Sequence, residues 1–201
     1  MPYRTVAREA SSRIVVCRSV FIAYVREVGS ETETRAFLHT IKASEPKADH
    51  HCFAYRLGEG KAAMVHAADD GEPSGSAGRP ILGALLSAGV TNTMAVVARY
   101  FGGKKLGIPG LIEAYRAVTI EALSQAGAVD REHCCGFVLP VPYDRLDSAR
   151  HLIRGLGGRE CGVAYGAVVT VRFEIPVQAR AAVLSALAGL GLTPAWTGDG
   201  H

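Results

Sequence analysis

The spacing of apolar residues in the first half of the chain alternates between a strand period and a helix period. Residues 14–28 are apolar and β-branched with a break near residues 18–19, which predicts two short strands. A capping box at residues 30–33 predicts that a helix begins there, and this helix should end before Pro46. Residues 50–68 read as two strands around a glycine-rich turn, so we expect a hairpin.

Two further helices should flank a buried strand at residues 93–99. The first should begin near Pro80 and end at Gly89, and the second should begin at Pro109 and end at Gly127. The residues expected to face the core are Ile81, Leu82, Leu85 and Leu86 in the first helix and Leu111, Tyr115, Val118 and Ala122 in the second.

The second half of the chain follows a different order: strand, helix, strand, strand, helix, strand. The expected segments are residues 134–141, 144–156, 160–165, 167–175, 176–187 and 192–197. This βαββαβ order is that of a ferredoxin-like sandwich. Because the pattern changes near residues 130–132, we expect an α+β protein of two domains, 1–130 and 131–201.

Composition places the chain among folded globular proteins but excludes few functions. Hydrophobic residues make up 48% and charged residues 20% of its 201 residues, which excludes wholesale disorder. The formal net charge of +3 is spread evenly, because residues 1–130 hold 15 basic and 13 acidic side chains and residues 131–201 hold 7 and 6. Neither half is therefore a basic tail that would bind nucleic acid by charge alone.

The cysteines and the uncharged stretches argue against disulfides and membrane spans. The five cysteines are odd in number and none has C-x-x-C spacing, so we expect neither a disulfide framework nor a closed zinc site. The uncharged residues 80–98 and 181–198 are interrupted by turn-forming residues. Residues 1–9 lack the apolar core of a secretory signal, so we expect a cytoplasmic protein without membrane contact.

A first glycine-containing loop, residues 69–78, reads D-D-G-E-P-S-G-S-A-G and precedes the helix at Pro80. One interpretation is an ordered turn that caps this helix. The other is a functional loop at a helix N-terminus, where N–H groups favour anions and the acids could hold a hard cation such as Mg²⁺. Its candidate site residues are Asp69, Asp70, Glu72, Ser74 and Ser76.

A second loop, residues 99–107, reads R-Y-F-G-G-K-K-L-G between a buried strand and a helix. Adjacent glycines can expose N–H groups and two lysines add positive charge, which favours an anion-binding nest. The alternative is a plain turn with solvated lysines. The loop matches neither a Walker A motif nor G-x-G-x-x-G. The candidate anion- or nucleic-acid-binding residues are Arg99, Gly102, Gly103, Lys104 and Lys105.

The predicted strand after residue 50 carries His51 and Cys52, whose side chains should point to opposite faces. This divergence weakens a Cys–His nucleophile pair. His66 on the neighbouring strand could join His51 in binding zinc, but a histidine on a sheet is more often hydrogen-bonded within the fold than a metal ligand. We therefore treat His51 and Cys52 only as residues that could support a site in the loops.

Four motifs follow one another along the chain. They read H-C-x-A-Y at residues 51–55, D-D-G-E-P-S-G-S-A-G-x-P at 69–80, V-V-x-R-Y-F-G-G-x-K-L-G at 96–107 and G-L-x-x-A-Y at 110–115. The ordered series resembles the IMPACT family in its two-domain bacterial, YigZ-type form. The resemblance implies an N-terminal α+β domain with the ribosomal-protein, elongation-factor-like fold. It also implies a C-terminal ferredoxin-like domain similar to the last domain of elongation factor G.

The resemblance further implies a setting in translation. Eukaryotic relatives regulate translation by competing for the activator of a starvation-responsive initiation-factor kinase, partly through a domain not recognisable in these residues. For the bacterial form it implies association with RNA or the ribosome, or with a protein partner in translation control. Some bacterial relatives carry a proline-dipeptidase label. No metal-ligand set or nucleophile constellation is recognisable here, so we expect neither a metal nor a cofactor.

Two hypotheses follow, beside a third interpretation in which the motifs only hold the domain together and the function lies in the surface between the two domains. The first is a translation-associated binding module, with a regulatory role, that contacts RNA or the ribosome through Arg99, Lys104 and Lys105. The alternative is a small-molecule hydrolase or phosphate-handling enzyme that uses the 69–78 loop with His51. An enzyme needs the two loops to form one pocket with free acids or a metal, whereas acids that cap a helix serve the fold. We favour the binding module and assign no catalytic residue.

Overall fold

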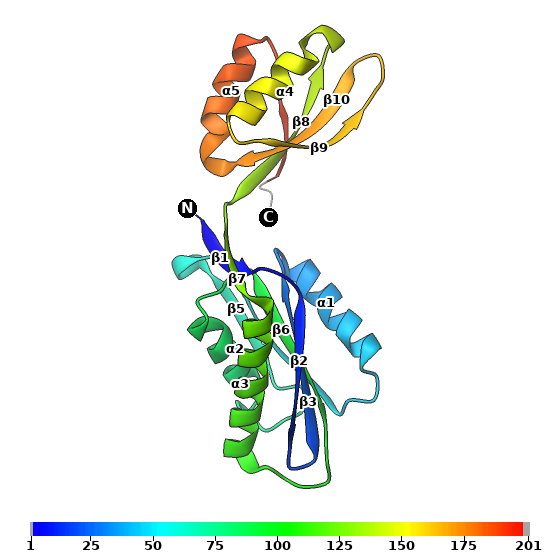
Figure 1. Cartoon of the computed structure of the whole chain (residues 1–201), viewed down its shortest axis with the longest axis vertical. Coiled ribbons are helices and arrows are strands. Elements are labelled where there is room, and N and C mark those ends of the chain that lie inside the picture. Colours follow the sequence, from blue (N-terminus) through cyan, green and yellow to red (C-terminus); the bar gives the residue numbers. More distant parts are fainter. Residues whose placement is uncertain (1, 199–201) are drawn as a thin grey trace. The chain divides into compact units, whose positions relative to one another are not determined.

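A five-stranded antiparallel sheet forms the centre of the N-terminal unit, residues 3–131, in the computed structural model (Figure 1). The structure describes residues 2–198. The strands follow the order β2-β3-β6-β4-β5. Their bounds are β2 Ala10–Val16, β3 Ser19–Glu27, β4 His50–Leu57, β5 Met64–Ala68 and β6 Thr93–Tyr100. A separate two-stranded ribbon pairs β1 (Tyr3–Val6) with β7 (Ala128–Arg131).

Helices cover both faces of this sheet. On one face, α1 (Glu31–Ser44) buries Phe37 and Ile41. A variant of its capping box forms: the Ser30 hydroxyl accepts the Glu33 N–H at 3.3 Å, and the Glu33 carboxylate accepts the N–H of Gly29, one residue before the N-cap, at 3.0 Å. On the other face lie α2 (Gly78–Ser87) and α3 (Gly107–Ala126), whose apolar sides pack on β3, β4 and β6.

Two details of these helices differ from the sequence-based expectation. Leu86 was expected to face the core but is 48% exposed. The core side of α2 is taken by Ile81, Ala84 and Leu85, and the next residue lies 100° further round the helix. The third helix, α3, begins at Gly107, two residues before Pro109. No helix among residues 2–198 is long and apolar enough to cross a membrane.

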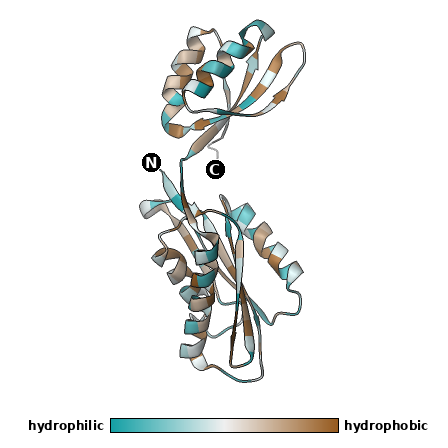
Figure 2. Ribbon diagram, viewed as in Figure 1, coloured by the Kyte–Doolittle hydropathy of each residue, from teal (hydrophilic) through white to brown (hydrophobic). Residues whose placement is uncertain are grey.

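The C-terminal unit, from residue 132, is the expected ferredoxin-like βαββαβ sandwich. Its antiparallel sheet has the order β11-β8-β10-β9, with α4 and α5 packed on its apolar side. The bounds are β8 Cys134–Val141, α4 Leu146–Gly155, β9 Arg159–Ala164, β10 Val169–Pro176, α5 Arg180–Gly189 and β11 Ala195–Gly198. Figure 2 shows apolar stretches along the strands of both units, whereas α4 is mostly hydrophilic.

Candidate functional site

Residues from the four motifs meet at one buried point of the N-terminal unit. Glu72 comes from the 69–78 loop, Arg99 from the end of β6 and Tyr115 from α3. The Glu72 Oε1 accepts hydrogen bonds from Arg99 Nη1 at 2.5 Å and from the Tyr115 hydroxyl at 2.8 Å. Cys52 of β4 completes the group, with its Sγ 3.3 Å from the Tyr115 hydroxyl oxygen. We call Cys52, Glu72, Arg99 and Tyr115 the motif cluster.

The motif cluster is almost completely shielded from water. The side chains of Arg99 and Glu72 are only 6% and 3% exposed. The Arg99 guanidinium lies 5.4 Å from the centroid of the Phe21 ring, and the Tyr115 ring meets the same ring edge-on at 5.1 Å. Buried charges persist only when they are paired and hydrogen-bonded. Arg99 is therefore paired with Glu72 through Nη1, while its buried Nε has no hydrogen-bond partner among the described residues. Glu72 is not a free acid.

The thiol of Cys52 and the phenol of Tyr115 are both neutral in this environment. Burial raises the pKa of the Cys52 thiol to about 12, although its hydrogen bond with Tyr115 lowers it, and the Glu72, Asp70 and Asp69 charges raise it further. Burial likewise raises the pKa of Tyr115. Because the thiolate is the reactive form of cysteine, Cys52 is not an activated nucleophile.

Asp69 uses its carboxylate to hold the first loop against the start of α2. Its Oδ2 accepts the Gly75 N–H at 2.8 Å, and its Oδ1 accepts the N–H groups of Ala77 and Gly78 at 3.0 and 2.8 Å. Desolvation raises the pKa of this carboxyl, but the three amides and the Arg79 charge outweigh it, so the pKa is lowered overall. The Asp69 carboxylate therefore already accepts the backbone N–H groups that an external anion would need as donors.

The other polar residues of this loop are largely engaged within the fold. The Asp70 carboxylate accepts the His51 N–H at 2.7 Å and lies 3.6 Å from Lys42 Nζ. The Ser76 hydroxyl donates to the Pro73 carbonyl at 2.6 Å, while Ser74 is exposed. Asp69 thus caps the start of α2, as the capping interpretation of the loop expects, whereas Asp70 and Glu72 are engaged elsewhere in the fold. No group of three His, Cys, Asp or Glu among the described residues could hold a metal ion.

His51 and His66 do not come together. The His51 Nε2 lies 3.0 Å from the Glu45 carbonyl oxygen, and since a carbonyl only accepts, this nitrogen carries the proton. His66 pairs with Tyr55 across the β4–β5 ladder, and its ring lies 5.6 Å from the Tyr55 ring. The zinc site considered as an alternative for these histidines therefore has no geometry to support it.

The second loop uses Gly102 and its first two amides for the fold. The Phe101 N–H donates to the Asp49 carboxylate at 2.7 Å, and the Gly102 N–H donates to the Ser19 hydroxyl at 3.1 Å. A Cβ on Gly102 would lie 2.1 Å from the Arg18 carbonyl carbon. Gly102 is therefore required where the β2–β3 turn crosses this loop, and its amide is not part of an open nest.

The end of the second loop remains exposed. Lys104 and Lys105 reach solvent, and Gly103 turns the chain with a φ of +81°. The loop leads into α3 at Gly107, where no side chain caps the helix and the first turn holds no acidic residue. We call residues 103–107 the lysine tip. An uncapped helix N-terminus beside two ammonium groups favours a negatively charged partner.

Tyr115 is the cluster member that sequence reasoning did not select as a site residue. Its position on the apolar face of the helix predicts burial, and it is fully buried. The sequence feature that could have identified Tyr115 is its hydroxyl, because a buried hydroxyl on that face needs a hydrogen-bond partner. Glu72 supplies the acceptor from a loop 43 residues earlier in the chain.

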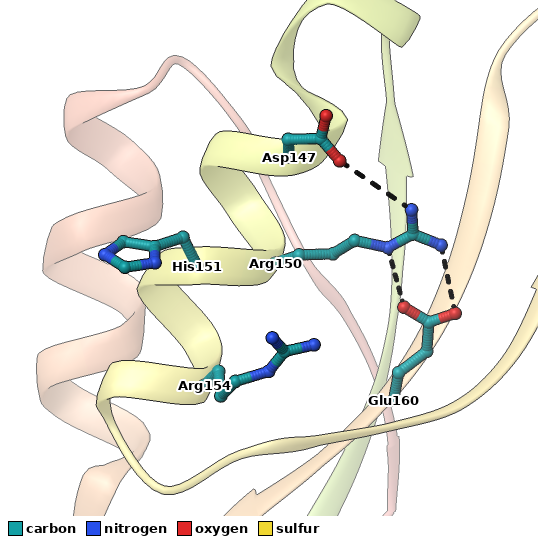
Figure 3. A pocket seen from close by; sticks show the side chains of 5 residues that line it. All are labelled: Asp147, Arg150, His151, Arg154 and Glu160. Carbon is teal, nitrogen blue, oxygen red and sulfur yellow. Dashed lines mark hydrogen bonds and ion pairs between the residues drawn. The ribbon is translucent and has the colours of Figure 1, made fainter.

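In the C-terminal unit, charged side chains line a hollow of about 680 Å³ (Figure 3). Arg150 Nε and Nη2 donate to the two Glu160 oxygens at 2.8 and 3.1 Å, and Asp147 lies 3.9 Å from Arg150. His151 and Arg154 also line the hollow. Acids and bases are mixed here, so this hollow does not attract anions as strongly as a purely basic surface would.

Comparisons with known proteins identify the family of this chain. The model of the Impact N-terminal domain matches residues 17–123. The chain is 43% identical over 130 residues to the IMPACT family member YvyE of Bacillus subtilis, which covers 65% of this chain and 59% of that protein. It is 33% identical over 170 residues to the IMPACT family member YigZ of Escherichia coli, covering 84% of this chain and 83% of that protein.

A solved structure described as the crystal structure of an hypothetical protein matches 99% of this chain and 98% of its own. The TM-score is 0.72 and the sequence identity 28%. The chain thus spans about three fifths of the B. subtilis relative and more than four fifths of the E. coli relative. These matches confirm the expected resemblance, and the chain belongs to the IMPACT family.

Proposed function

We propose that this protein is a binding module that acts in translation and contacts RNA or the ribosome through the lysine tip. The observation that carries the proposal is the exposure of Lys104 and Lys105 beside an uncapped, acid-free start of α3. Membership of the IMPACT family supports the setting in translation, because regulation of translation is what the family resemblance implies.

The residues that bind in this proposal are fewer than the sequence suggests. Arg99 and Gly102 serve the fold, so Gly103, Lys104 and Lys105 remain for a negatively charged partner. Two lysines neutralise two phosphates at most, and each such contact adds about −0.7 to the slope of log affinity against log salt for a single strand. Binding should therefore be modest and sensitive to salt.

No observation favours the hydrolase alternative. Asp69, Asp70 and Glu72 are each occupied by amides or cations of the same chain. Burial and neighbouring acids raise the pKa of Cys52, and His51 donates to a backbone carbonyl. The described residues of the loops thus offer neither a general base nor an activated nucleophile.

Binding of the full chain to purified ribosomes and to ribosomal RNA tests the proposal at two salt concentrations. The variant Lys104→Ala/Lys105→Ala should bind on the order of tenfold more weakly and show a shallower salt dependence. A matched control, Arg35→Ala/Lys47→Ala, removes the same charge from exposed positions in and after α1 and should bind like the wild type. If both variants bind equally well, the lysine tip is not the binding surface.

A further inference from the structure

A groove borders the exposed sides of α2 and α3. Two hollows, of about 340 and 400 Å³, lie along these helices, and Ser87 lines both of them. Because they share this residue, the hollows adjoin. Gly83 and Ile112 line the first hollow, while Ala84 and Ile120 line the second.

The groove exposes apolar side chains at a helical spacing. Ile112 is 39% and Ile120 is 45% exposed. They lie eight positions apart, about two turns, on the solvent side of α3, with Arg116 between them. Leu111, Tyr115 and Val118 take the core side of this helix. Single exposed apolar residues are ordinary, but two exposed isoleucines that line adjoining hollows, with an arginine between them, suit an amphipathic partner.

The charged residues that line the groove are all basic in the described part of the chain. Arg79 and Arg116 line the first hollow and Arg4 lines the second, whereas no Asp or Glu lines either. Glu113 and Glu121 follow Ile112 and Ile120 in α3 but do not line the groove. The charges therefore suit a partner with carboxylates near its apolar face.

Gly83 has no structural requirement within the chain. It lies in the interior of α2, where glycine is less favourable than alanine. A Cβ at this position would meet nothing within 4 Å, so no neighbouring atom excludes a side chain. A side chain at this position would obstruct a partner that packs closely against α2, whereas glycine leaves room for it.

We propose that the α2–α3 groove binds an amphipathic helix that carries acidic residues. Its apolar side chains would lie between Gly83 and the two isoleucines. Its carboxylates would meet Arg79 near the start of α2, Arg116 between the two isoleucines and Arg4 in the second hollow. The ten residues of α2 extend about 15 Å, which matches roughly three turns of such a helix. A nucleic acid would meet the arginines but not the isoleucines.

The test uses a displayed library of amphipathic helical peptides. Peptides that bind the whole chain are selected from it. Both the apolar face and the flanking charges of the peptides are varied. Selected peptides should carry acidic flanks and should bind Gly83→Leu at least tenfold more weakly than the wild type. They should lose binding similarly to Arg79→Glu/Arg116→Glu, whose changes are at exposed positions. Gly155→Leu, at a glycine of α4 that also has nothing within 4 Å, is the matched control and should bind normally.

The proposal would be overturned by no enrichment, by enrichment of basic peptides, or by equal binding to wild type and Gly83→Leu. Displacement of the peptides by a single-stranded RNA oligonucleotide would also overturn it, because the groove would then be a nucleic-acid site. Circular dichroism verifies that each variant is folded. Lys104→Ala/Lys105→Ala should bind the peptides normally, so this proposal and the proposed role of the lysine tip can fail separately.

Discussion

Two arginine–glutamate pairs, one in each unit, show how burial rather than geometry decides the role of an ion pair. Arg150 and Glu160 form a two-point pair at 2.8 and 3.1 Å, with side chains 26% and 31% exposed. Arg99 and Glu72 share one contact of 2.5 Å, yet are 6% and 3% exposed. Water competes far more strongly for the first pair than for the second, so we expect the removal of one partner to cost more stability in the second pair.

The largest effect should follow from breaking the buried pair. Glu72→Gln keeps the side-chain shape but leaves the buried Arg99 charge uncompensated, which should destabilise the N-terminal unit by about 3–5 kcal/mol. Urea unfolding followed by hydrogen exchange of β4 and β6 measures this loss. The matched change Glu160→Gln should have a far smaller effect on the C-terminal unit.

Fluorescence of the single tryptophan distinguishes unfolding of the C-terminal unit from unfolding of the N-terminal unit. Trp196 packs 5.1 Å from the Phe137 ring in the C-terminal unit, so its fluorescence reports unfolding there. The fluorescence transition should be unchanged in Glu72→Gln. A shift of that transition as large as the loss in the N-terminal unit would contradict the assignment of the pair to one unit.

A smaller effect should follow from Tyr115→Phe, which removes only the hydroxyl. The ring keeps its packing against Phe21, while Glu72 loses the Tyr115 hydroxyl as a donor and keeps Arg99. A hydrogen bond to a charged acceptor contributes about 1.5–3 kcal/mol, and we expect a loss of this size in the same urea experiment. A neutral result would show that the hydroxyl is dispensable to the cluster.

The smallest of the three losses should come from Asp69→Asn, at about 0.5–2 kcal/mol, the range for a helix-cap residue. Asp69 has a lowered pKa, so its carboxylate stabilises the fold fully above the ordinary value of 3.8. That stabilisation is lost as the pH falls below this value through the folded-state pKa. Acid titration of stability should therefore be less steep for Asp69→Asn than for wild type, and identical curves would refute the capping role.

The sequence predicts most elements because their periodicity is local. The capping box of α1 and the βαββαβ order of the C-terminal unit both follow from neighbouring residues. The β1–β7 ribbon escapes prediction, since its strands have four residues each and pair Tyr3 with Arg131 across the whole unit. Such a pairing leaves no periodic signal in either strand.

The candidate site is harder to predict because residue type does not reveal burial. The motifs indicate that Glu72, Arg99 and the glycines matter, and the loops that carry them do meet, at Glu72 and Arg99. They meet as a closed ion pair rather than as an open pocket. Gly102 likewise gives the signal of an anion nest, although its neighbour is the backbone of Arg18. Only the three-dimensional contacts separate these interpretations.

The central claim is that the motif cluster is a buried structural unit, and a double-mutant cycle on Glu72 and Arg99 tests it most directly. The cycle uses Glu72→Gln, Arg99→Gln and their combination, with stability measured from urea unfolding of the N-terminal unit. The account predicts a coupling free energy above about 2 kcal/mol, because two buried partners that are removed together leave no lone charge. A coupling near zero would contradict it.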